Sequence, residues 1–134
     1  MEHLLSLLLT HPHMILLAKV ILTSFFWVAG LFGLFNFKVI VQEMIDVNLP
    51  VPQVFALATI ACQLGGPALL ISNAGGLGWL GAGALAVFTI LCIPVAHPFW
   101  KYEEPKRTPE FHIVLEHVTV VGGLMLAASM SILL

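Results

Sequence analysis

The sequence predicts an all-α membrane protein, a four-transmembrane-helix bundle with up-down-up-down topology. Of its 134 residues, 60% are hydrophobic and only 9% are charged, whereas about 25% of the residues in a soluble domain are charged. The mean hydropathy is +1.04. This composition excludes a water-soluble enzyme, a secreted disulfide scaffold and a disordered chain. The net charge of −2 and the lack of a basic run exclude nucleic acid as a partner.

Four apolar stretches are long enough to cross a hydrocarbon core of about 30 Å, which takes roughly 20 helical residues. The predicted crossings are residues 14–37, 52–72, 77–97 and 111–134. Residues 1–13 begin Met-Glu-His, without the basic start of a signal peptide. We expect the apolar stretch from His3 to Thr10 to form a short interfacial helix or an extension of the first crossing. Together the segments predict one domain over residues 1–134.

Local sequence explains where the predicted crossings begin and end. Leu49-Pro50-Val51-Pro52 favours an extended entry into the second helix, and Asn73-Ala74-Gly75-Gly76 predicts a tight turn after it. In Thr108-Pro109-Glu110, the threonine resembles an N-cap, the proline a first helical residue and the glutamate a first-turn acid of the fourth helix. Residues 38–48 form an amphipathic stretch. Four crossings would place both termini and the 73–76 turn on one face. The two longer loops and four of the five basic residues would lie on the other, which we call the loop face.

Small residues repeat every four positions in three of these helices, and such repeats let helices approach closely in lipid. The motifs are Ala29-x3-Gly33, Gly78-x3-Ala82-x3-Ala86 and Gly123-x3-Ala127-x3-Ser131. They predict a compact bundle.

A few polar side chains fall at membrane depth, where they are costly and therefore suggest function. His97 ends the third helix and His112 begins the fourth at the loop face, with Glu116 one turn deeper on the same helix face as His112. Lys38 ends the first helix at this face, and Gln63 lies near the middle of the second. We therefore expect a polar ligand pocket, open at the loop face, with Gln63 as its floor.

Four interpretations of this pocket remain open. His97, His112 and Glu116 offer ligands for zinc or iron, although no metal-site signature accompanies them. His112, Glu116 and Gln63 suit a quinone head group or a proton relay. The pocket would also suit another small-molecule substrate. In a purely structural interpretation, Glu116 is neutral or paired with Lys38 or a histidine, and Gln63 bonds to a neighbouring helix backbone. No nucleophile lies beside a plausible base, so the residues do not establish an enzyme.

Several short segments together resemble the DoxX family of small four-helix bacterial inner-membrane proteins. They are Val28-Ala29-Gly30-Leu31-Phe32-Gly33, Ile40-Val41-Gln42-Glu43-Met44, Asn48-Leu49-Pro50-Val51-Pro52, Gln63-Leu64-Gly65-Gly66-Pro67, His97-Pro98-Phe99-Trp100 and Glu116-His117-Val118. The resemblance implies a multi-pass protein of the bacterial inner membrane. Some relatives are subunits linked to thiosulfate:quinone oxidoreduction, and others accompany oxidative-stress enzymes.

The resemblance suggests a non-catalytic subunit, or a small-molecule-binding partner, of a membrane redox system. A quinone-interacting oxidoreductase subunit and a structural interaction protein are the alternatives. The family's usual Gly-x-x-Lys reads Gly30-Leu31-Phe32-Gly33 here, and Gln63 stands where an acidic residue is usual. Quinone is the one cofactor suggested. The expected partners are the lipid bilayer and either further copies of the chain or the other subunits of a larger membrane complex.

Overall fold

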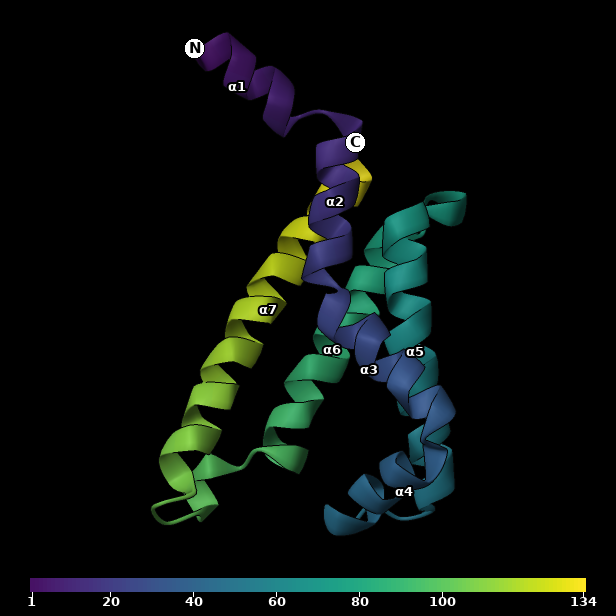
Figure 1. Cartoon of the computed structure of the whole chain (residues 1–134), viewed down its shortest axis with the longest axis vertical. Coiled ribbons are helices and arrows are strands. Elements are labelled where there is room, and N and C mark those ends of the chain that lie inside the picture. The colour runs from purple at the N-terminus through teal and green to yellow at the C-terminus, as the bar shows by residue number, and fades with distance from the viewer.

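The computed structural model describes all residues from 1 to 134 and consists entirely of helices (Figure 1). The helices are α1 (Glu2–Leu9), α2 (Pro12–Leu22), α3 (Ser24–Phe35), α4 (Phe37–Asp46), α5 (Pro52–Ser72), η1 (Ala74–Gly76), α6 (Gly78–Ala96), η2 (Phe99–Lys101) and α7 (Arg107–Leu133). The all-helical fold is as predicted.

Helices α5, α6 and α7 are the three that are long and apolar enough to cross a membrane, α6 being extended by η2. Up to five spans result if the bent pairs α1–α2 and α3–α4 each count as one. Both termini and the α5–α6 turn lie toward one end of the molecule in Figure 1. At the opposite end, α4 lies across the bundle near the level of the α6–α7 loop.

The turn between α5 and α6 is stabilised by Asn73, which ends α5 in the left-handed conformation with φ 48°. Its side-chain Oδ1 accepts a hydrogen bond from the backbone N–H of Gly78 at 2.8 Å. Asparagine tolerates this conformation better than most residues. The turn therefore folds α6 back along α5, as its sequence predicts.

Close approach between α5 and α6 depends on glycine. A Cβ atom on Gly81 would lie 2.5 Å from the backbone oxygen of Gly66 and 2.8 Å from Cβ of Leu69. Neither neighbouring atom is a flexible side-chain end, so any larger residue at Gly81 must push the two helices apart.

The main core joins four helices around fully or nearly fully buried apolar side chains. They are Phe26 from α3, Leu70 from α5, Ala82 and Leu85 from α6, and Leu124 and Ala127 from α7. A smaller cluster packs Ile40 of α4 against Ala56 and Ile60 of α5. Helices α3 and α4 therefore attach to the bundle chiefly through α5.

The prediction of one continuous helix over residues 14–37 is wrong, because the chain breaks at Thr23 between α2 and α3. The Thr23 hydroxyl donates to the carbonyl of Lys19 at 2.7 Å, and the Ser24 hydroxyl donates to that of Ile21 at 2.7 Å. The indole N–H of Trp27 reaches back to the carbonyl of Val20 at 3.2 Å. Such side-chain bonds compete with the helical backbone ladder.

The ends of two other elements also differ from expectation. Helix α7 begins at Arg107 rather than residue 111, so Thr108 lies inside its first turn. The Glu104 carboxylate accepts hydrogen bonds from both the N–H and the hydroxyl of Thr108, at 2.8 and 2.6 Å. The expected short N-terminal helix is present as α1, which ends at Leu9, and α2 starts at Pro12 with a 57° bend between them.

Candidate functional site

A cavity of about 580 Å³ lies between the helices and extends from the α4 end of the bundle inward to Gln63. We call it the inter-helix cavity. Its wall comes from α3, α4, α5, α6 and α7 and is mostly apolar, with Phe25, Phe26, Phe55 and Phe88 among its residues. Its polar lining consists of Glu43, Thr59, Gln63, Thr89, His97, Glu116 and His117. A largely apolar cavity of this size with a few converging polar groups is typical of small-molecule sites.

Gln63 is the buried polar group of this cavity. Its exposed fraction is only 9%, and it lies eleven residues into α5, about 16 Å from the helix start at 1.5 Å per residue. Its side chain makes no hydrogen bond to the protein, yet no side-chain polar atom is sealed away without a partner. Its amide therefore opens onto the inter-helix cavity. An unpaired buried amide is costly, about 1–3 kcal/mol, so a ligand that bonds to it would relieve that cost.

The backbone of α5 adds a second polar group at Gln63. Pro67 lies inside the helix and has no N–H to donate to the carbonyl four residues earlier, which is that of Gln63. The Gln63 residue therefore combines an unpartnered side-chain amide with a carbonyl that lacks its helical donor.

Two carboxylates line the cavity without a cationic partner. The one contact within 4 Å between a basic side chain and a carboxylate is that of His97 with Glu110, so neither Glu43 nor Glu116 has a basic partner. No lysine or arginine lines the cavity. The expectation that Glu116 pairs with Lys38 or with a histidine therefore does not hold, and the cavity has an acidic character.

The two histidines of the cavity have the same hydrogen-bonding arrangement. Nδ1 of His97 lies 2.7 Å from Oε2 of Glu110, and Nδ1 of His117 lies 2.8 Å from the carbonyl oxygen of Ile113. A carbonyl or an ionised carboxylate only accepts, so in both rings Nδ1 carries the hydrogen. In its neutral form, each ring then offers Nε2 as an acceptor. The rings contact each other edge to face, with centroids 5.0 Å apart.

The inter-helix cavity brings together three of the five residues that the sequence singled out, Gln63, His97 and Glu116. Lys38 and His112 do not line it. Lys38 is exposed on α4, whose buried side is centred on Ile40. His112 is also exposed, near the loop end of α7, where its ring neighbours that of Phe111.

His117 and Glu43 line the cavity, although the site predicted from sequence leaves them out. The buried stripe of α7 contains Leu124 and Ala127. Stepping back from Leu124 by four and then three residues reaches Val120 and His117, which face the same side of a helix. His117 therefore faces the cavity because of its helical spacing from Leu124, a residue outside the small-residue repeat that the sequence analysis singled out.

The geometry bears on the metal interpretation as well. No three side chains among the histidines, cysteines, aspartates and glutamates lie close enough together to hold a metal ion. The set His97, His112 and Glu116 is divided, because His112 lies outside the cavity. The arrangement offers hydrogen bonds and negative charge rather than metal ligands.

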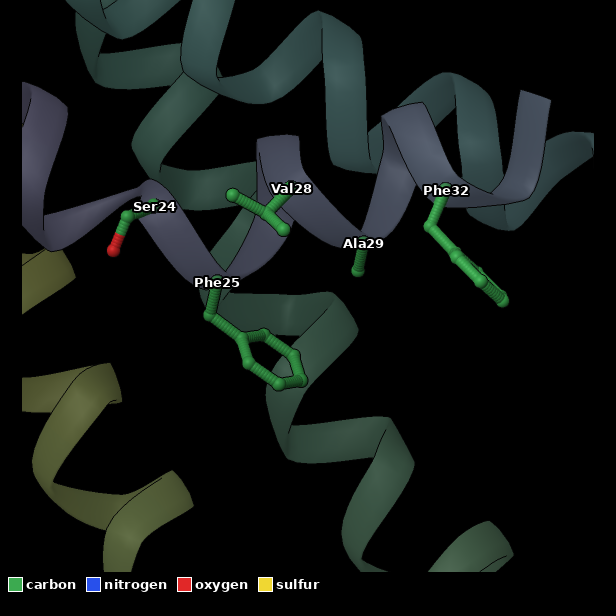
Figure 2. A pocket seen from close by; sticks show the side chains of 5 residues that line it. All are labelled: Ser24, Phe25, Val28, Ala29 and Phe32. Atoms are coloured by element: carbon green, nitrogen blue, oxygen red, sulfur yellow. The ribbon is translucent and has the colours of Figure 1, made fainter. Parts of the chain in front are cut away.

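A second, shallow groove lies wholly on α3, and Figure 2 shows its five side chains. They are Ser24, Phe25, Val28, Ala29 and Phe32. Phe25, which is 67% exposed, lines both this groove and the inter-helix cavity. Phe25 therefore forms the part of the cavity wall that meets the outer apolar surface.

Comparison with known families gives one match, in which the family model described as DoxX covers residues 14–98. That range is more than half of the chain. The chain belongs to the DoxX family. No curated protein and no solved structure matches it.

The DoxX family match covers the segment from α2 to His97, and so contains Glu43, Gln63 and His97 of the cavity. Glu116 and His117 lie beyond it, on α7. Together with the apolar helices, the match makes this DoxX-family chain a multi-pass membrane protein. Its long helices are therefore in contact with a lipid bilayer.

Proposed function

We propose that this DoxX-family protein binds a lipid-soluble small molecule in the inter-helix cavity, as a non-catalytic partner of a membrane redox system. The unpartnered amide of Gln63 carries the proposal, because a buried amide that opens onto a cavity favours a bound hydrogen-bonding group. The unpaired carboxylates of Glu43 and Glu116 and the two histidines add polar groups toward the cavity mouth.

The proposal extends to topology and location. The pair α2–α3 spans 24 residues despite its break and, as a single crossing, would give four crossings in the bacterial inner membrane. The redox link is supported by the family alone, in which relatives are associated with quinone-linked and oxidative-stress enzymes. Quinone is accordingly the first ligand to look for, and copies of the chain or other membrane subunits are the proposed partners.

The test is to fill the cavity and follow what purifies with the protein. Ala58 lines the cavity, whereas Ala61 of the same helix is exposed and does not. The protein with Ala58→Phe, the protein with Ala61→Phe and the unchanged protein would be extracted in mild detergent, and their bound small molecules identified by mass spectrometry. We expect a molecule that is retained by the unchanged protein and by Ala61→Phe and is lost from Ala58→Phe. The same bound molecules in all three proteins would contradict the proposal.

A further inference from the structure

The inter-helix cavity is open on one side of the bundle. Helices α3 and α4 pack on α5, and α7 packs on α6, but neither α3 nor α4 packs extensively on α7. Figure 1 shows α7 diverging from α4 toward the loop face. Residues on both sides of this gap, Phe25 and Met44 on one and Val120 on the other, line the cavity. In a bilayer, this side opening would face lipid.

The polar lining of the cavity consists mainly of hydrogen-bond acceptors. When ionised, Glu43 and Glu116 accept hydrogen bonds and donate none. In their neutral forms, His97 and His117 offer Nε2 as an acceptor, because their Nδ1–H groups are engaged. The hydroxyl of Thr89 already donates to the carbonyl of Leu85 at 2.8 Å. The Gln63 amide offers the main free N–H donors beside these acceptors.

We infer that the inter-helix cavity takes, from the bilayer, an amphiphile whose head donates hydrogen bonds and carries a positive charge, such as a protonated amine. This inference rests on the proposed function and names the chemistry of its ligand, which differs from the quinone that the family suggests, because a quinone head accepts hydrogen bonds and carries no positive charge. Glu43 and Glu116 are exposed and unpaired, and because no lysine or arginine lines the cavity, they attract a cation and repel an anion. The carbonyl oxygen of the Gln63 amide can also accept from an ammonium group, while the phenylalanine-rich wall contacts the tail.

The same charges exclude the commonest anionic amphiphiles. A fatty acid or a phosphate head would bring negative charge toward Glu43 and Glu116, where no fixed cation compensates. Charged hydrogen bonds contribute more than neutral ones, so amine, alcohol and carboxylate heads on one tail should bind in that order.

The experiment uses the protein in phosphatidylcholine nanodiscs with three photoactivatable probes. The probes carry the same twelve-carbon tail and differ only in an amine, alcohol or carboxylate head, and the labelled peptides are mapped by mass spectrometry. We expect the amine to label the α3 and α6 segments of the cavity at least about tenfold more than the carboxylate, with the alcohol between them. Excess unlabelled dodecylamine should compete with this labelling, whereas butylamine, which partitions poorly into lipid, should not.

Variants identify the groups responsible. The double variant Glu43→Gln and Glu116→Gln should remove the amine preference. The matched double variant Glu2→Gln and Glu103→Gln should retain it, because it changes the same charge at side chains that are likewise exposed and unpartnered but do not line the cavity. The variant Ala58→Phe should block cavity labelling by every probe.

Each remaining outcome contradicts a distinct claim. Carboxylate labelling equal to amine labelling, but still blocked by Ala58→Phe, would overturn the inferred head chemistry and leave the proposed function intact. Equal competition by butylamine would overturn entry from the bilayer. Labelling that Ala58→Phe does not change would overturn both the inference and the proposed function.

Discussion

Nδ1 of His97 lies 2.7 Å from Oε2 of Glu110 and forms a hydrogen bond with it. His97 follows the last residue of α6, and Glu110 lies in the first turn of α7. Both side chains are largely covered, with exposed fractions of 24% and 18%. The pair therefore joins two helices across their connecting loop and orients an imidazole ring that lines the inter-helix cavity.

Removing the charge of Glu110 should loosen this connection. We expect Glu110→Gln to lower the free energy of unfolding by about 1–2 kcal/mol, since a charge-assisted hydrogen bond becomes a neutral one. Thermal unfolding in detergent, together with hydrogen exchange across the α6–α7 loop, would measure the loss. Glu103→Gln is the control, because that exposed side chain of the same loop has no partner. Equal unfolding temperatures for the two variants would show that the His97–Glu110 hydrogen bond contributes nothing.

The close packing of α5 on α6 predicts a sharp difference between two glycines of α6. A Cβ atom on Gly81 would meet the backbone of α5 at 2.5 Å, whereas one on Gly83 has nothing within 4 Å. Gly81→Ala should therefore destabilise the protein by about 1–3 kcal/mol through overpacking. Gly83→Ala should be neutral or slightly stabilising, because alanine favours helix. Thermal unfolding of both variants tests the helix interface, and a loss of equal size in both would contradict it.

We expect the Gln63 side chain to contribute to ligand binding and not to the stability of the ligand-free protein. We expect Gln63→Met to leave the free energy of unfolding of the ligand-free protein unchanged or to raise it by about 1 kcal/mol, because an unpaired buried amide is removed. The same variant should lose the thermal stabilisation that a bound ligand provides. Gln53→Met, at an exposed position of α5, is the matched control and should retain that stabilisation. A large loss of stability in ligand-free Gln63→Met would instead mean that the amide has a protein partner.

Four crossings can be tested by labelling single cysteines from each side of the membrane. In a protein with Cys62→Ala and Cys92→Ala, we expect Ser6→Cys and Ala74→Cys to react from one side and Glu103→Cys from the other. This pattern requires α2–α3 to act as one crossing. Labelling of Ser6→Cys from the same side as Glu103→Cys would show that α2–α3 does not cross.

Helices bounded by strong local signals could be predicted from sequence, and the broken one could not. Helix α5 covers the predicted residues 52–72 because Pro52 starts it and Asn73 ends it in a left-handed conformation. Helix α6 likewise agrees to within one residue at each end. At the break at Thr23, the indole of Trp27 reaches the carbonyl of Val20, beside the hydroxyl bonds of Thr23 and Ser24. The hydrophobic pattern of residues 14–37 does not predict that contact.

The depth of each site residue in the membrane could be predicted by counting along its helix. The side of the helix bundle that the residue faces could not be predicted in this way. Gln63 lies well inside α5 as expected, because the rise per residue is fixed. Which side of α7 faces the cavity depends on how Leu124 and Ala127 pack in the core, and this tertiary contact turns His117 inward. The spacing from His112 to Glu116 shows only that the two residues share a face of α7. It does not show which face of α7 is turned toward the cavity.

The most direct test of the account is an experimental density map of the protein in nanodiscs, at a resolution that shows side chains. We expect elongated density inside the inter-helix cavity, with one end within hydrogen-bonding distance of the Gln63 amide and of Glu116. A map in which α7 closes against α3, and Gln63 bonds to a neighbouring backbone with no space left for a ligand, would contradict the account.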